Sequence, residues 1–245
     1  MYRKAALIWI LTTWLFTIAA YKIAAQESAY SVVQTLALHQ KPNGTEGKLQ
    51  LLMDKRLTES VREKLWEKGD WSFVFPPESS TYKEFSSRPP VKSRLVIRND
   101  KGKVIAERGL ETPMAKLEPW NPSSDSNQFF LLTEDYSSGA GSYNGPGTSL
   151  LQISDAAFHD VKADTASGQE QPIRLVKSLK SDWQIVSRDN AGEILSVSCR
   201  PKSDGNFVIG YTRYSFDGNQ WRKYKREVDG FWESDDPFPD RSAFP

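Results

Sequence analysis

The chain is dominated by short apolar runs rich in β-branched residues, each closed by a turn signal, and this punctuation constrains the fold most. The clearest example joins residues 94–98 to residues 103–107 through Asn99-Asp-Lys-Gly102, a four-residue hairpin loop with glycine where a left-handed residue is needed. Similar pairs of runs lie at 127–133 with 148–154, 183–187 with 193–199, and 206–214 with 220–227. A parallel α/β fold needs helices between its strands, and these intervals offer almost none. We therefore expect a mainly β protein, either an antiparallel β-sandwich or a barrel-like sheet stack.

The first part of the chain carries one short helix signal. Thr58 or Ser60 can cap a helix, and Glu63 supplies the acid of a capping box with Ser60. Val61 and Leu65 then recur at helical spacing. Strands are expected on both sides of this helix, at residues 31–39 and 48–53 before it and at residues 71–75 after it.

A Ser/Pro-rich stretch at residues 78–90 has the composition of a loop or linker. We expect it to separate a small α+β portion, residues 26–77, from an antiparallel β-rich domain, residues 91–228. The last segment, residues 229–245, combines four large aromatic residues with several aspartates and prolines. Proline disfavours helix, and aromatic rings gain most when they are buried. We expect this segment to be an extended strap that covers one face of a sheet.

The amino terminus has the pattern of an export signal. Arg3 and Lys4 precede an uncharged apolar run at residues 5–20, which is shorter than the roughly 20 residues needed to span a bilayer. We expect a signal peptide at residues 1–25, cut after Ala25 or, alternatively, after Ala20. If the segment stays uncleaved, residues 5–25 anchor the protein in the membrane. Both outcomes place the remaining chain outside the cytoplasm, in a periplasmic or extracellular compartment.

Charge and cysteine content exclude several classes of protein. The chain has 32 Lys and Arg residues and 31 Asp and Glu residues. Removal of the leader leaves 29 basic residues and the same 31 acidic residues, for a net charge of −2. Nucleic-acid binders are normally basic, so we expect no nucleic-acid partner. Cys199 is the single cysteine and lies in a strand-like context, which indicates a buried free thiol. One cysteine and two histidines cannot build a Cys-rich or three-histidine zinc site, and we expect neither metal nor cofactor.

The glycine-rich stretch at residues 135–147 is the best candidate for a binding site. A phosphate loop precedes a helix and carries a lysine, whereas this stretch leads into a strand and has none. The alternative is a long hairpin loop that exposes Tyr136, Tyr143 and Asn144. Aromatic side chains provide flat platforms for the faces of sugar rings. We take these three residues and Trp221 as candidate ligand-binding residues.

These features favour an exported, non-enzymatic binding or interaction protein whose ligand is a glycan or another protein. The alternative is a secreted hydrolase, because a pair of carboxylates at a suitable separation can serve as acid and base. Its candidate carboxylates are Glu134, Asp135, Asp235, Asp236 and Asp240. A third possibility is a structural component of the cell envelope, which would be marked by a large exposed apolar patch.

Overall fold

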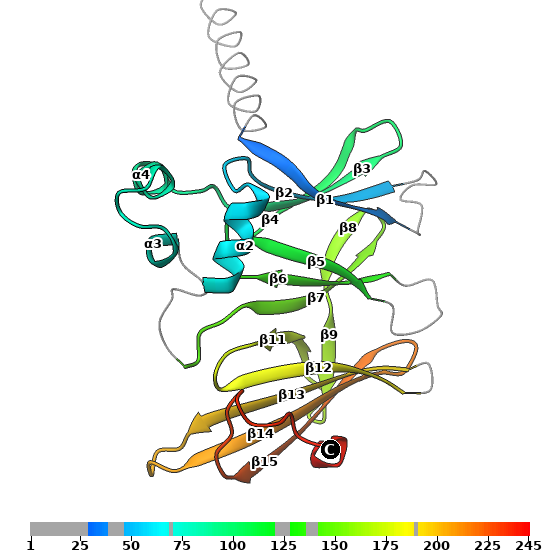
Figure 1. Cartoon of the computed structure of the whole chain (residues 1–245). Coiled ribbons are helices and arrows are strands. Elements are labelled where there is room, and N and C mark those ends of the chain that lie inside the picture. The colour runs from blue at the N-terminus through cyan, green and yellow to red at the C-terminus, as the bar shows by residue number, and fades with distance from the viewer. Residues whose placement is uncertain (1–28, 39–46, 69–70, 121–127, 136–141, 189–190) are drawn as a thin grey trace, which may run out of the picture.

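The structure is a computed structural model that describes residues 29–38, 47–68, 71–120, 128–135, 142–188 and 191–245. It is mainly β, as the punctuated pattern predicts, and its strands form three sheets (Figure 1). Sheet A has the order β1 (Tyr30–Leu38), β2 (Gly47–Asp54), β3 (Arg94–Asn99) and β4 (Val104–Gly109). Sheet B has the order β11 (Arg174–Val176), β7 (Gly147–Ser154), β6 (Phe129–Glu134) and β5 (Ala115–Trp120), with β8 (Ala157–Asp160) paired to β7.

Sheet C has the order β10 (Glu170–Pro172), β9 (Lys162–Thr165), β15 (Trp221–Asp229), β14 (Phe207–Phe216), β13 (Ala191–Pro201) and β12 (Ser181–Arg188). Its strands pair antiparallel except for β15 and β9, which are parallel. The sheets are open and do not close into a barrel, so the barrel alternative is wrong. The predicted hairpin at Gly102 is confirmed, because β3 pairs antiparallel with β4 and the glycine has a φ of 76°.

Sheet B is the middle layer because both of its faces are buried. Successive side chains of a strand point to opposite faces. On β6, Phe130 and Leu132 belong to the apolar core shared with sheet A, whereas Phe129 and Leu131 belong to the core shared with sheet C. Figure 1 shows this order, with sheet A and the helices at one end, sheet B between, and sheet C at the other end.

The outer face of sheet C packs against the carboxyl-terminal segment (Figure 1). Val197, Cys199 and Ile209 from the sheet form a buried cluster with Trp232 from this segment. The segment is extended apart from a turn at residues 234–236 and one short 3-10 turn, η2 (Arg241–Ala243), and Arg241 pairs with the buried carboxylate of Glu193 at 3.1 Å. It therefore adds a fourth layer, held by aromatic burial at one point and by charge at another. Cys199 is a buried free thiol, as its sequence context indicates.

Three helices lie beside sheet A, where the sequence predicted one. Helix α2 (Glu59–Lys68) is the expected helix. It begins at Glu59, so of the two predicted capping residues Thr58 precedes the helix and Ser60 lies within it. The predicted strand at residues 71–75 is wrong, because helix α3 (Trp71–Val74) occupies it. Large residues in this stretch also recur at helical spacing. The ring of Phe75 packs edge-on against the ring of Phe85, with their centres 6.4 Å apart.

The predicted loop at residues 78–90 is also wrong, because it contains helix α4 (Ser80–Ser87). The hydroxyl of Ser79 caps this helix by accepting a hydrogen bond from the Tyr82 N–H at 3.1 Å. Phe85 projects from the helix into the core and is fully buried. Strands β2 and β3, which lie on either side of residues 78–90 in the sequence, pair within one sheet, so this stretch does not separate two portions of the chain.

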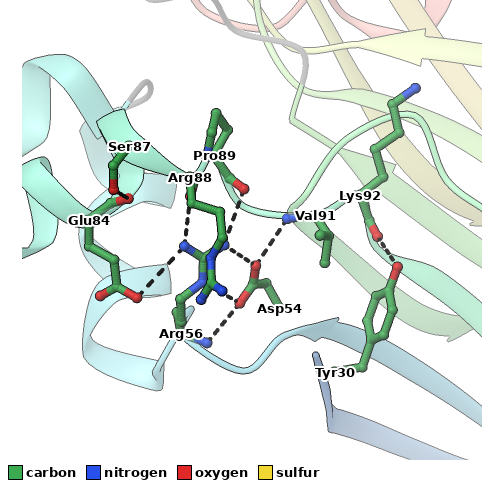
Figure 2. Close-up of polar contacts among 9 residues, drawn as sticks. All are labelled: Tyr30, Asp54, Arg56, Glu84, Ser87, Arg88, Pro89, Val91 and Lys92. Carbon is green, nitrogen blue, oxygen red and sulfur yellow. Dashed lines mark hydrogen bonds and ion pairs between the residues drawn. The ribbon is translucent and has the colours of Figure 1, made fainter. Parts of the chain in front are cut away.

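A buried ion pair holds the chain where it returns from α4 to sheet A (Figure 2). The carboxylate of Asp54 accepts hydrogen bonds from Arg56 Nε at 2.9 Å and from the Val91 N–H at 3.0 Å. The guanidinium of Arg56 donates in turn to the carbonyl oxygens of Arg88 and Pro89, at 2.7 and 3.1 Å. Two side chains at the end of β2 thus fix the backbone of residues 88–91, which leads into β3.

The expected signal peptide, residues 1–25, lies outside the described residues. Within the part of the chain that is described, the helices are too short or too polar to cross a membrane.

Candidate functional site

The described end of the glycine-rich loop is clamped against the segment that connects β11 to β12. The Lys180 N–H donates to the carbonyl of Ser142 at 3.1 Å, and the Lys177 N–H donates to the carbonyl of Pro146 at 3.2 Å. A Cβ atom on Gly145 would collide with the carbonyl oxygen of Lys177, so this close approach requires glycine. The loop end is therefore positioned by backbone contacts on both sides.

This clamp places Tyr143 and Asn144 on the wall of a cavity of about 430 Å³, which we call the loop cavity. Tyr143 is 50% exposed, so half of this side chain remains open to solvent. The other walls come from the end of β4, from β6 and β7, and from β8 and β11. Their charged members are Arg108, Glu111, Glu134, Asp160 and Arg174. The cavity thus combines an exposed aromatic ring with charges of both signs.

Two of the charged lining groups are held by the protein itself. Arg108 Nη2 pairs with Asp160 Oδ1 at 2.8 Å, and both side chains are partly exposed. Glu134 is 8% exposed, and its Oε1 accepts a hydrogen bond from the Glu111 N–H at 2.8 Å. These contacts fix the positions of the carboxylates and leave them as acceptors on the cavity wall.

Arg174 and Glu111 are the remaining charges of the cavity, and both residues are exposed. Arg174 is exposed on β11, and its guanidinium forms no ion pair with any residue that the structure describes. Glu111 forms an exposed ion pair with Lys92 at 2.8 Å, and the hydrogen bond from Lys92 lowers the pKa of this carboxyl. Arg174 is therefore the cation of the cavity that a ligand can engage without first breaking an internal pair.

The structure brings some of the predicted binding residues together and separates others. Tyr143 and Asn144 line the loop cavity, and Tyr136 lies outside the described residues. Trp221 does not line the loop cavity. It is 3% exposed in the core between sheets B and C, where its ring lies 5.2 Å from that of Phe216. In the turn before it, Asp217 accepts hydrogen bonds from the Asn219 and Gln220 N–H groups.

The candidate carboxylates also divide between two regions. Glu134 lines the loop cavity, and Asp135 follows it at the end of β6. The remaining three, Asp235, Asp236 and Asp240, lie on the carboxyl-terminal segment and do not line this cavity. Asp240 caps η2 by accepting a hydrogen bond from the Ser242 N–H at 2.8 Å, which lowers its pKa. Asp236 accepts one from the Glu233 N–H at 3.0 Å, so both serve turn geometry.

Sequence reasoning missed Arg108, Asp160 and Arg174. Each is an ordinary charged residue in a strand, and nothing local distinguishes it from a solvated surface charge. They converge because β8 and β11 pair with neighbouring stretches of the same edge of β7, opposite β6, and because Arg108 reaches Asp160 across 52 residues of sequence. This long-range pairing carries no local signal.

A wider groove of about 550 Å³ lies beneath α2, between β1 and β5, which are edge strands of their sheets. Its aromatic lining residue, Trp66, is already covered by the ammonium group of Lys116 at 4.4 Å from the ring centre. No predicted site residue lies there. The loop cavity is therefore the better candidate, because its aromatic ring faces solvent.

The described residues contain no group of three His, Cys, Asp or Glu side chains placed to hold a metal ion. Comparisons of the chain with protein-family models, with curated proteins and with solved structures gave no match.

Proposed function

We propose that this chain is an exported binding protein and that the loop cavity holds a glycan. The observation that carries the proposal is the exposed ring of Tyr143 beside Asn144, at the mouth of a cavity with fixed donors and acceptors. A tyrosine ring can stack on the apolar face of a sugar while its hydroxyl bonds to a neighbouring group. Amide, carboxylate and guanidinium groups can pair with the sugar hydroxyls.

The size of the cavity supports a small polar ligand. About 430 Å³ falls within the range of roughly 300 to 1,000 Å³ that is usual for small-molecule sites. The clamp at Gly145 supports a preorganised site, because Tyr143 is held before a ligand arrives. Preorganisation lowers the entropic cost of binding.

The export part of the proposal rests on the leader at residues 1–25. Its test is the amino-terminal sequence of the protein recovered from the periplasm or the medium. Cleavage after Ala25 leaves Gln26 as the first residue, and an uncleaved chain recovered with the membrane fraction supports the anchor at residues 5–25. Recovery from the cytoplasm with an intact leader contradicts the export proposal.

The experiment for the binding part is a glycan and cell-wall panel probed with the purified protein. The test variant is Tyr143→Ala, and the matched control is Tyr224→Ala, which removes a 37% exposed tyrosine from sheet C, outside the loop cavity. We expect the wild type and Tyr224→Ala to bind the same panel members and Tyr143→Ala to lose them. Failure of a folded wild-type sample to bind any glycan contradicts the proposal.

A secreted hydrolase is the second candidate. The observation that favours it is the burial of Glu134 on the wall of a cavity that also holds Asp160. Release of new reducing ends from a bound glycan by the wild type, lost in Glu134→Gln, supports this alternative. Binding without turnover supports the non-enzymatic proposal.

A further inference from the structure

A second, smaller cavity adjoins the loop cavity. It has a volume of about 280 Å³, and we call it the Trp221 cavity. Three buried aromatic residues, Phe129, Phe216 and Trp221, contribute to its lining. Polar side chains complete it, including Gln152 from β7 and Asn219 from the turn before β15. Trp221, which the sequence predicts as a ligand-binding residue and which does not line the loop cavity, therefore lines a neighbouring cavity.

The two cavities meet at Asp160, which lines both. This residue ends β8, and its carboxylate is held by Arg108 from the wall of the loop cavity. The two side chains keep 39% and 28% of their surface exposed, so the ion pair is accessible to solvent. A ligand that occupies both cavities would therefore pass over this pair.

We propose that the two cavities are successive subsites for one ligand, an oligosaccharide of at least two rings. This inference rests on the proposed function and specifies its ligand. The Trp221 cavity lies just below the usual volume of an independent small-molecule site, so it suits one unit of a longer chain.

The charges of the Trp221 cavity define the ligand further. Its described lining includes three carboxylates, on Asp160, Asp164 and Glu170, and one cation, Lys162. Asp160 pairs with Arg108 at 2.8 Å and Glu170 with Lys162 at 3.2 Å, so the excess negative charge comes from Asp164. This excess disfavours an anionic ligand unit, because like charges repel. The unit bound here is therefore uncharged or cationic, as in a neutral or amino-sugar oligosaccharide.

The test is the dependence of affinity on chain length, measured by calorimetry with three series of one to six units. The probes are cello-oligosaccharides, which are neutral, chitosan oligosaccharides, which are cationic, and oligogalacturonates, which are anionic. We expect the affinity of a neutral or cationic series to rise at least tenfold between one and three units and then level off. We expect the oligogalacturonates to show no such rise.

Two variants separate the subsites. Gln152→Ala changes only the Trp221 cavity, and it should weaken the binding of the longer oligomers about fivefold, as expected from one lost hydrogen bond, while the single sugar binds unchanged. Tyr143→Ala should weaken both. Unchanged binding of the single sugar by Gln152→Ala also shows that the variant is folded.

The outcomes distinguish failure of this inference from failure of the proposed function. If no series binds at any length, both are overturned. If sugars bind with an affinity that does not depend on length, or if Gln152→Ala weakens short and long ligands equally, the two-subsite inference is overturned and the binding function stands. A rise with length for the oligogalacturonates alone overturns the charge argument.

Discussion

Replacement of Asp54 by Asn tests the buried ion pair that holds residues 88–91 (Figure 2). The side chains of Asp54 and Arg56 are 3% and 10% exposed. Removal of one member of a buried pair leaves the other charge without compensation and costs roughly 3 to 5 kcal/mol. Asparagine keeps one acceptor oxygen, and the carboxylate of Glu84 remains 3.7 Å from Arg56. We therefore expect the loss at pH 7 to lie near the lower limit, at about 3 kcal/mol.

The same pair predicts a dependence on pH. Burial raises the pKa of Asp54, but the hydrogen bonds from Arg56 and the Val91 N–H outweigh it, so the pKa of this carboxyl is lowered in the folded protein. A lowered pKa stabilises the fold above the ordinary Asp value of about 4, and this stabilisation is lost as the pH falls through the folded value. The difference in unfolding free energy between the wild type and Asp54→Asn should therefore shrink between pH 7 and pH 3.

The assay is urea unfolding followed by tryptophan fluorescence, at pH 7 and at pH 3. The control variant is Glu111→Gln, which removes a carboxylate from an exposed ion pair and should leave the unfolding midpoint nearly unchanged. A loss below about 1 kcal/mol at pH 7, no more than an ordinary hydrogen bond contributes, would refute the importance of the buried pair. A difference that stays constant between the two pH values would refute the assignment of the charge to Asp54.

Three further predictions concern other parts of the molecule. Gly145→Ala should displace the clamped loop end and weaken binding of the panel glycan at least as much as Tyr143→Ala, while melting of the core stays close to that of the wild type; tight binding by this variant would contradict the clamp. Ala156 has a φ of 58° in the turn between β7 and β8, so Ala156→Gly should raise the unfolding free energy by up to about 1 kcal/mol, and a destabilised variant in urea unfolding would show that the turn is not strained. Burial raises the pKa of Tyr214 to about 12, so this tyrosine should not ionise near pH 10 in the folded protein. In an ultraviolet titration, the folded wild type and folded Tyr214→Phe should therefore show the same amplitude near pH 10, and the variant should show one tyrosine less only when both are unfolded. A smaller amplitude in the folded variant would contradict the burial of Tyr214.

Local pattern was enough to predict the hairpins but not their assembly. The hairpin at Gly102 follows from alternation and one left-handed glycine, and both signals are local. The stacking of the three sheets depends on which strands are buried on both faces. In the sequence, this burial is indicated by the unbroken apolar run at residues 129–132.

The helices α3 and α4 were mispredicted because local preference was ambiguous. Trp71 and Phe75 fit both a strand of period two and one turn of helix, and the contact with Phe85 decides between them. That contact is tertiary, so the segment alone could not indicate it. The Ser/Pro-rich composition of residues 78–90 concealed the cap at Ser79.

The candidate site shows the same division. Tyr143 and Asn144 were predictable because a long glycine-rich loop exposes its side chains. The charged walls of the loop cavity come from strands that are distant in sequence, and their meeting at Arg108 and Asp160 is a product of sheet pairing. Trp221 was selected as a platform residue, but its burial follows from its place between sheets B and C.

The most direct test of the account is a crystal structure of the protein with the tightest-binding glycan of the panel. We predict a sugar ring against Tyr143 in the loop cavity, within hydrogen-bonding distance of Asn144 or Arg174. A glycan bound elsewhere on the molecule, with the loop cavity free of sugar, would contradict the account.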